Sequence, residues 1–365
     1  MSVFQKRRDA LRQRMRERSL PALLVTDETN VTYLTGFTGD SSYLLVAPGR
    51  DRLITDGRYT QQLAEECPEL ELAVRTPGSK ITDFTAEVAA RLGLAALGIE
   101  ADHVVVSFYE RLRQSLKSTP LASTSSLVES LREIKDEGEI QKIRAAVTVA
   151  EQAFARLRGT LRGEQTEKQV ADELEHQIRL AGGTCGAFPS IVGVGPRAAL
   201  PHGRPVETSR LGDCDFVLID WGARREHYHS DLTRVLVTGK LSPQVEALYE
   251  LVLRAQQAAI AAIRPGAIMK DVDAAARNLL AQAGYTSQFN HALGHGIGLA
   301  IHELPRLAPE QSRPLAAGMV VTVEPGVYLP DWGGIRIEDD ILVTPDGHEV
   351  LTNVPTSLAD CHQQL

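Results

Sequence analysis

The run VLIDWG at residues 217–222 predicts an apolar strand that carries an acid, Asp220, close to its end. The run VTVEPG at residues 321–326 has the same form, with Glu324 as its acid. In each run a glycine follows the acid by two residues, which indicates that the strand stops there. We therefore expect both carboxylates to emerge from rigid supports.

Both runs belong to a longer internal repeat. The segment LRGEQTEKQVADELEHQIRLAGG (161–183) aligns with IRPGAIMKDVDAAARNLLAQAGY (263–285), an offset of 263 − 161 = 102 residues. Further along, the two acidic runs also align, so that Asp220 falls on Glu324. Two similar halves around a pseudo-twofold axis would bring strand-borne carboxylates face to face. This arrangement predicts one α+β domain with a site at its centre.

The spacing of apolar residues, with Gly and Pro as stops, predicts the elements of this domain. Helices are expected before Arg158 and at 166–181, 242–263 and 270–283. Between and after them we expect β-rich runs at 186–194, 214–221, 226–237, 320–329 and 334–343.

The first third of the chain predicts a separate α/β domain, because strand and helix patterns alternate over it. A first amphipathic helix is expected at residues 3–18. The segment NVTYLTGFTGDSSYLLVAPG (30–49) is expected to form short strands between its turn residues. Nothing here looks catalytic by itself. We set the domain boundary so that the two domains are 1–127 and 128–365.

Five residues are the candidate ligands of a metal centre: Asp220, Asp231, His295, Glu324 and Glu338. Four carboxylates close together would repel one another and have raised pKa values. A pair of divalent cations removes that repulsion and gives the acids a reason to converge. Oxygen-rich ligation with one imidazole favours Mn(II) or Co(II), with Zn(II) or Fe(II) as alternatives.

The runs that carry these residues, VLIDWG, SDLTR, HALGHGIG, VTVEPG and GGIRIEDD, resemble those of the pita-bread metallopeptidases. That family includes proline dipeptidases, aminopeptidase P and methionine aminopeptidases. The resemblance covers residues 130–365, and all five ligand positions are filled. The N-terminal third resembles the creatinase-like domain that the proline-specific members carry and that methionine aminopeptidases typically lack.

The resemblance implies a role for each ligand. Asp220 would bind one ion, His295 and Glu324 the other, and Asp231 and Glu338 would bridge both. Glu324 would also be the general base that takes the proton of the attacking water. Such a cation pair activates water and polarises a carbonyl group.

Three histidines match positions that contact substrate in the family. His202, His291 and His302 would be catalytic histidines around the scissile bond. Arg306 and Arg336 are the candidates for holding a substrate carboxylate, and Arg336 could instead neutralise a ligand carboxylate, because it shares a strand face with Glu338. A helical zinc pair at His291 and His295 is rejected, because glycines surround His295. His227 and His229 are expected to be exposed loop residues.

These features predict a hydrolase of the Xaa-Pro bond at a free N-terminus, most simply an Xaa-Pro dipeptidase (prolidase). The alternative within the family is an Xaa-Pro aminopeptidase that acts on longer peptides. A methionine aminopeptidase is disfavoured by the N-terminal domain, and a creatinase-like amidinohydrolase by the acidic ligand set. From a different class, a non-catalytic peptide- or histone-binding homologue is disfavoured because the ligand set is intact.

Composition limits the partners and the compartment. The formal net charge of −8 argues against nucleic acid as a partner. No apolar run approaches the roughly 20 residues of a membrane span. Four scattered cysteines without a CxxC pair indicate reduced thiols and a cytoplasmic location. A homodimer is expected from the resemblance.

Overall fold

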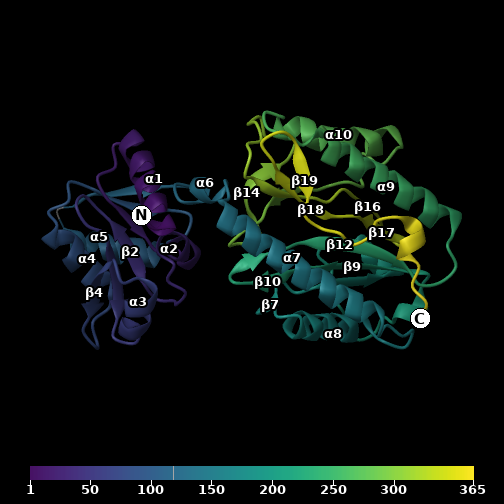
Figure 1. The fold of residues 1–365 in the computed structure, drawn as a ribbon, viewed down its shortest axis with the longest axis horizontal. Helices are drawn as coiled ribbons and strands as arrows, with labels where there is room; N and C mark the ends of the chain where they lie inside the picture. Colours follow the sequence, from purple (N-terminus) through teal and green to yellow (C-terminus); the bar gives the residue numbers. More distant parts are fainter. Residues whose placement is uncertain (118) are drawn as a thin grey trace. The chain divides into compact units, whose positions relative to one another are not determined.

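A six-stranded mixed sheet forms the centre of the N-terminal part of the chain (Figure 1). The computed structural model describes residues 1–117 and 119–365, which divide into two compact units, Met1–Arg132 and Glu133–Leu365. The strand order in the first unit is β4-β3-β2-β1-β5-β6. Its strands are β1 (Leu23–Val25), β2 (Tyr43–Val46), β3 (Arg52–Asp56), β4 (Glu71–Arg75), β5 (Leu97–Glu100) and β6 (Leu121–Thr124).

Helices pack around this sheet and make the first unit α/β, as predicted. They are α1 (Val3–Glu17), α2 (Glu28–Thr35), α3 (Thr60–Glu66), α4 (Ile81–Arg91), α5 (Val106–Leu116) and α6 (Glu129–Arg132). Helix α2 corrects the expectation of strands from residue 30 onwards. The Asp27 side chain accepts a hydrogen bond from the Asn30 N–H, and Gly36 ends the helix with φ 83°. These two caps outweigh the strand preference of Val31 and Thr32.

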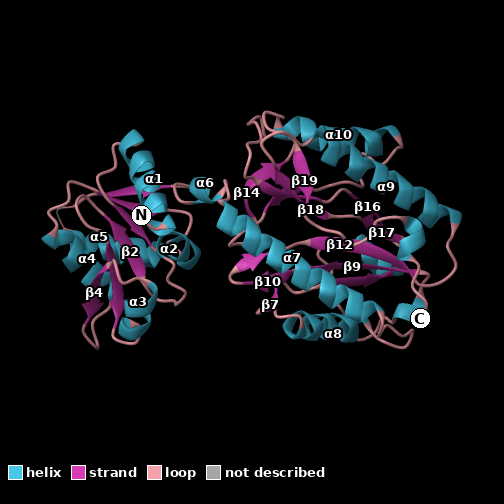
Figure 2. Ribbon diagram, in the orientation of Figure 1, coloured by secondary structure: helices cyan, strands magenta, loops and turns pink. Residues whose placement is uncertain are grey.

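The second unit contains two helix pairs with strands between them (Figures 1 and 2). The helices are α7 (Glu137–Arg158), α8 (Glu167–Leu180), α9 (Pro243–Ala262) and α10 (Met269–Gln282). One sheet has the order β12-β9-β8, and a larger one has the order β14-β13-β15-β18-β19. Their strands are β8 (Ile191–Val194), β9 (Phe216–Trp221), β12 (Leu232–Val237), β13 (Gly294–Gly296), β14 (Glu303–Leu307), β15 (Val320–Val323), β18 (Asp339–Val343) and β19 (His348–Val350).

Two small sheets complete the second unit. One has the order β11-β10-β7 and the other pairs β16 with β17. Their strands are β7 (Cys185–Gly186), β10 (Ala223–Arg225), β11 (Tyr228–His229), β16 (Gly326–Leu329) and β17 (Gly333–Arg336). Short 3-10 helices occur at η1 (Gly195–Ala199), η2 (Leu211–Asp213) and η3 (Leu358–Cys361).

The internal repeat predicted from the sequence is present in this architecture. In the first half α7 and α8 precede β8, β9 and β12, and β9 pairs with both neighbours in antiparallel fashion. In the second half α9 and α10 precede β13, β15 and β18, and β15 is the central antiparallel strand. A backbone bridge between Thr233 and Glu338 joins the two sheets. Strand-borne acids from both halves can therefore meet.

Two hydrophobic clusters, one within the first half and one that spans both halves, support the strands that carry the acids. In the first half Trp221 of β9 stacks on Phe154 of α7, with ring centroids 4.1 Å apart. The Trp221 indole N–H donates to the Ala150 carbonyl oxygen at 3.0 Å. In the second half Val321 and Val323 of β15 are fully buried in a cluster with residues of α9 and α10. Among the described residues, no helix combines the length and apolarity that crossing a membrane requires.

Candidate metal centre

The five candidate ligands come together between the two halves of the second unit. Atoms of Asp231, His295 and Glu338 that could bind metal lie within 4.8 Å of one another. The His295 Nε2 atom is 3.4 Å from Glu324 Oε1 and 3.6 Å from Asp231 Oδ2. Asp220 lies close enough to Asp231, Glu324 and Glu338 to act on their ionisation. The sequence positions that span 220–338 thus converge at one place.

Backbone geometry orients the imidazole toward the acids. The His295 Nδ1 atom is 3.1 Å from the Gly296 carbonyl oxygen, so this nitrogen donates its proton there. The lone pair of Nε2 then points toward Glu324 and Asp231, the tautomer that a metal ligand requires. Burial lowers the pKa of His295 to about 3, with a further contribution from His302, so the ring is neutral near pH 7.

The acids are too close and too deeply buried to be stable as four free carboxylates. Burial, with the neighbouring carboxylates of Glu338 and Asp220, raises the pKa of Asp231 well above its usual range. Burial likewise raises the pKa of Glu338 well above that range and the pKa of Glu324 to about 8. Arg336 is the only cation that the structure shows in an ion pair with these acids, through Asp220. Three negative charges are left uncompensated when all four acids ionise.

These residues fit a pair of divalent cations. The buried Asp220 Oδ1 atom has no hydrogen-bond partner among the described residues, as expected of an atom kept for a ligand. The donor set is four carboxylates and one neutral imidazole, which suits oxygen-preferring divalent ions. Two such ions would supply the positive charge that the cluster lacks.

A set of hydrogen bonds holds the acids, and sequence reasoning missed most of it. The Thr233 hydroxyl donates to Glu338 Oε2 at 2.6 Å and accepts from Arg336 Nε at 3.0 Å. Arg336 is 3% exposed and also donates to Asp220 and to the Tyr328 hydroxyl. Each of the three guanidinium nitrogens has a partner within the protein, which favours the carboxylate-neutralising role for Arg336 over contact with substrate. Thr233 lies within the quoted run SDLTR, but only the tertiary structure shows its two partners.

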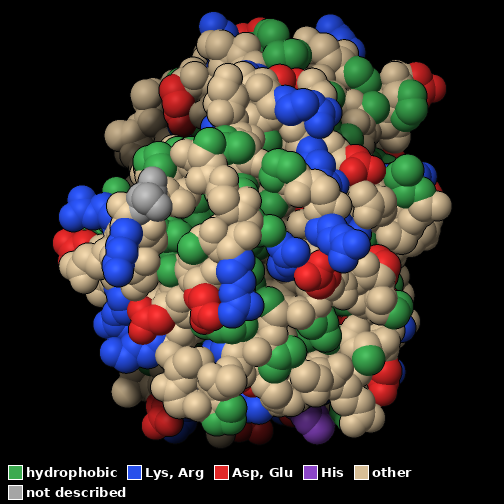
Figure 3. All heavy atoms as spheres, turned by 90° about the vertical axis from the view of Figure 1, so that its left-hand side faces the viewer, with side chains coloured by type: hydrophobic (Ala, Val, Ile, Leu, Met, Phe, Trp, Pro, Cys, Tyr) green, Lys and Arg blue, Asp and Glu red, His purple; other side chains and the backbone are tan. Residues whose placement is uncertain are grey.

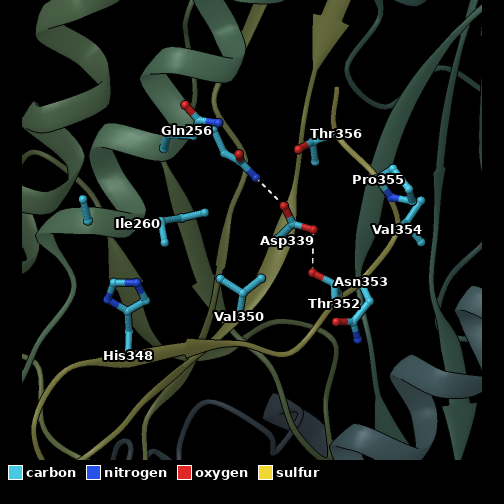
Figure 4. Close-up of a pocket in the computed structure, with 12 residues that line it drawn as sticks. Gln256, Ile260, Asp339, His348, Val350, Thr352, Asn353, Val354, Pro355 and Thr356 are labelled. Carbon is cyan, nitrogen blue, oxygen red and sulfur yellow. Dashed lines mark hydrogen bonds between the residues drawn. The ribbon is translucent and has the colours of Figure 1, made fainter. Parts of the chain in front are cut away.

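A second set of buried polar groups lies behind Glu338. Arg234 donates to the Glu338 carbonyl oxygen and to Asp339 Oδ1, both at 2.6 Å. Gln256 and Thr352 also donate to the Asp339 carboxylate (Figure 4). A cavity of about 420 Å³ adjoins these residues. Three of the polar residues that line this cavity, Gln256, Asp339 and Thr352, form the hydrogen bonds next to Glu338 that help to hold the metal centre.

The three candidate catalytic histidines differ in exposure. His302 is exposed and its ring meets that of His295 edge-on, with centroids 4.4 Å apart. His202 is exposed and lies near enough to His302 and Asp220 to influence their ionisation. His291 is tied down: its Nδ1 donates to the Ala292 carbonyl oxygen, and its Nε2 accepts from the Tyr328 hydroxyl at 3.0 Å.

Two other positions complete the comparison with the sequence. Arg306 is paired with His295 in the β13–β14 register and its side chain is exposed, 3.8 Å from Glu310. His229 is buried, which corrects the expectation that it is exposed. Its Nδ1 lies 3.0 Å from the Gly298 carbonyl oxygen, so the ring ties β11 to the glycine-rich segment after β13.

Glycines around His295 allow the close approach of neighbouring backbone. A Cβ atom at Gly294 would lie 2.0 Å from the Thr322 carbonyl oxygen. A Cβ atom at Gly296 would lie 2.2 Å from the Leu304 carbonyl oxygen. Any side chain at either position would push β13 away from β14 or β15, and His295 with it.

Comparison with known families extends over both units. A model of metallopeptidase family M24 matches residues 141–345, which include all five candidate ligands. A model of the creatinase/prolidase N-terminal domain matches residues 7–134.

Comparison with individual proteins gives the same coverage. The Xaa-Pro dipeptidase of Pyrococcus horikoshii is 34% identical over 344 residues, 94% of this chain and 96% of that protein. The solved structure of the Xaa-Pro dipeptidase from Bacillus anthracis has a TM-score of 0.93 and 36% identity, over 97% of this chain and 99% of that one. That of the X-Pro aminopeptidase from Thermotoga maritima has a TM-score of 0.87 and 34% identity, over 97% of this chain and 100% of that one.

Proposed function

The chain belongs to metallopeptidase family M24, and we propose that it is an Xaa-Pro dipeptidase, a prolidase, with a pita-bread catalytic domain. It hydrolyses the peptide bond that precedes proline in substrates with a free N-terminus. The observation that carries the proposal is the convergence of four acids and one neutral imidazole in a chain whose relatives are named for this activity. Proline removes the amide N–H and fixes φ, so this bond calls for a dedicated peptidase.

The cofactor of this reaction is a pair of divalent ions, Mn(II) or Co(II) in our proposal. Asp220 would hold one ion, and His295 and Glu324 the other. Asp231 and Glu338 would be shared between them. When bound, such ions activate a water molecule and polarise the carbonyl group of the scissile bond.

The protein groups around the ions then have defined tasks. Glu324, ionised beside the bound cations, accepts the proton of the attacking water as the general base. His302 and His202, both exposed beside the acids, hydrogen-bond the substrate carbonyl oxygen and the leaving proline nitrogen. His291 is the third candidate, and it would have to exchange its hydrogen bond with Tyr328 for one to substrate.

The substrate's free carboxylate would be held by Arg306, which is exposed and reaches the edge of the site from β14. The buried Arg336 would act on substrate only through Asp220 and Tyr328. Arg306 would therefore favour dipeptidase activity over aminopeptidase activity. A dipeptide ends at this arginine, whereas a longer peptide passes it.

A second candidate is an Xaa-Pro aminopeptidase. It is favoured by the similarity to the Thermotoga maritima enzyme, whose coverage and TM-score approach those of the dipeptidases. A non-catalytic peptide- or histone-binding protein would have no need of four buried acids in one cluster.

A substrate-length series tests the proposal. Purified protein, with each divalent metal added in turn, is assayed on Xaa-Pro, Xaa-Pro-Yaa and longer peptides, with Glu324→Gln as the control. We expect hydrolysis of Xaa-Pro that is lost on chelation, and a fall of about 10²–10⁴ in kcat for Glu324→Gln. Preference for tripeptides would replace the dipeptidase by the aminopeptidase. Absence of hydrolysis with every metal would refute both.

Assembly and location follow the same proposal. We expect a homodimer, to be checked by the molar mass in solution. The four cysteines form no disulfide, which is consistent with a cytoplasmic protein.

A further inference from the structure

A cavity of about 470 Å³ lies wholly within the N-terminal unit. It is bordered by the residues that follow β3, the end of β4, and the beginnings of α4 and α5. Four cations line it, Arg58, Arg75, Lys80 and Arg111, and none of the described lining residues is acidic. This is an unusual local surplus in a chain whose net charge is −8. Helices α4 and α5 lie at the left of Figure 1, the side that faces the viewer in Figure 3, where several basic side chains surround hydrophobic ones.

Part of this positive charge is not compensated. Asp56 accepts hydrogen bonds from both Arg58 and Arg75, so one acid is shared between two guanidinium groups. Neither Lys80 nor Arg111 forms an ion pair with an acid that the structure describes. The cavity therefore presents excess positive charge to whatever enters it.

Two helix N-termini add to this potential. Both α4 and α5 are 11 residues long, and the residues at their N-caps, Lys80 and Val105, provide no side-chain hydrogen bond. The first N–H groups of each helix thus have no side-chain cap. Because the N-terminal end of a helix dipole is positive, anions bind favourably at such ends.

Two of the lining residues, Thr82 and Arg75, each carry a buried polar atom without a hydrogen-bond partner among the described residues. The Thr82 side chain lies in the first turn of α4, is 5% exposed, and its Oγ1 has no hydrogen-bond partner among the described residues. The Arg75 Nε atom is in the same state, although Nη1 donates to the Ser79 carbonyl oxygen and Nη2 to Asp56. Buried donors are rarely left unpaired. An acceptor-rich ligand would satisfy both.

The remaining lining combines aromatic and apolar side chains with three serines, Ser41, Ser79 and Ser107. Tyr43 of β2 and Phe108 of α5 meet edge-to-face, with centroids 5.6 Å apart and an interplanar angle of 89°. Ile81 lies beside them on the lining. The cavity volume is within the range of about 300–1,000 Å³ that is typical of small-molecule sites. The lining therefore offers cations for an anionic group and aromatic side chains for a ring.

We propose that this cavity binds a small phosphomonoester whose organic part carries an aromatic ring. A phosphate group offers three acceptor oxygens and up to two negative charges, which matches four cations, two helix ends and two unpaired donors. A carboxylate offers two oxygens and one charge and would leave several of these donors unused. The site lies outside the catalytic unit and is independent of the proposed peptidase activity.

The test is calorimetric titration of the full-length, metal-loaded protein with phenyl phosphate, with benzoate and inorganic phosphate as comparison ligands. Phosphate can also bind at the metal centre, so variants of the cavity locate the binding. We expect the double variant Lys80→Ala/Arg111→Ala to bind phenyl phosphate about tenfold more weakly or worse, a ratio that corresponds to ~1.4 kcal/mol. Arg91→Ala, at the far end of α4, is the control, because it removes the same kind of charge outside the cavity.

A second variant guards against a folding defect. Thr82→Val keeps the shape of the side chain but removes the unpaired hydroxyl group, so it should weaken phenyl phosphate binding without lowering Tm. Inorganic phosphate should bind more weakly than phenyl phosphate, and benzoate more weakly still. The proposal fails if the wild-type protein binds no phenyl phosphate or if benzoate binds as tightly as phenyl phosphate. It also fails if Arg91→Ala causes the same loss of affinity as the double variant.

Discussion

Replacing Thr233 by valine should loosen the metal centre without touching any proposed ligand. The fully buried Thr233 hydroxyl donates to Glu338 Oε2 at 2.6 Å and accepts from Arg336 Nε at 3.0 Å. Valine has nearly the same shape but can do neither, so Glu338 loses the donor that fixes its carboxylate. A hydrogen bond to a charged group contributes about 1.5–3 kcal/mol. Loss of one supporting partner typically weakens metal binding about 10–100-fold, or ~1.4–2.7 kcal/mol.

The two estimates agree, so we expect a 10–100-fold rise in the Kd for Mn(II), measured by competition with a chromophoric chelator. The control is Thr85→Val in α4, where a buried threonine hydroxyl donates to the Ile81 carbonyl oxygen at 2.7 Å. This variant changes stability but should leave metal affinity within about twofold of wild type. An unchanged Kd for Thr233→Val would refute the idea that Thr233 holds Glu338 in its binding geometry.

Three further predictions follow from the same geometry. In metal-free protein, burial raises the pKa of Glu324 to about 8 and that of Glu338 well above its usual range. Carboxyl groups with raised folded-state pKa values stabilise the fold at low pH and lose this contribution as pH rises. The Tm of metal-free protein, measured by calorimetry, should therefore fall between about pH 5 and about pH 9. The Tm of metal-loaded protein should fall less over the same range. Arg306→Ala should raise KM for Xaa-Pro about tenfold and change KM for longer peptides little, because only the dipeptide ends at this arginine; equal effects on both would contradict the assignment. Gly294→Ala should abolish metal binding or folding, because its Cβ would lie 2.0 Å from the Thr322 carbonyl oxygen, and normal metal content and activity would disprove this.

Local sequence patterns were sufficient to predict the strands at whose ends Asp220 and Glu324 lie. Asp220 and Glu324 each stand at the end of an apolar run bounded by glycine, and this signal is contained in six residues. The repeat could be predicted for the same reason, because similar local patterns recur at an offset of 102 residues in the helical segments and 104 in the acidic runs. The convergence of the acids then follows from the way the sheets of the two halves meet at the bridge between Thr233 and Glu338.

Other features depend on contacts that the sequence does not display. The role of the Thr233 hydroxyl depends on its hydrogen bonds with Glu338 and Arg336, which are more than a hundred residues away in the sequence. His229 is buried, and its Nδ1 donates to a carbonyl oxygen 69 residues away. For α2 the local signal is present in the sequence, because Asp27 and Gly36 are typical start and stop residues of a helix, and these caps outweigh the strand preference of the residues between them.

The backbone bridge between Thr233 and Glu338 has a consequence for biogenesis. A nascent chain that has emerged as far as Glu324 already contains four of the five candidate ligands, yet the acid that completes the cage is still to be synthesised. Stable metal binding is then among the last events in maturation, because it requires the two halves of the second unit to pack together. Metal ions that bind earlier find an incomplete ligand set and can exchange until Glu338 is in place.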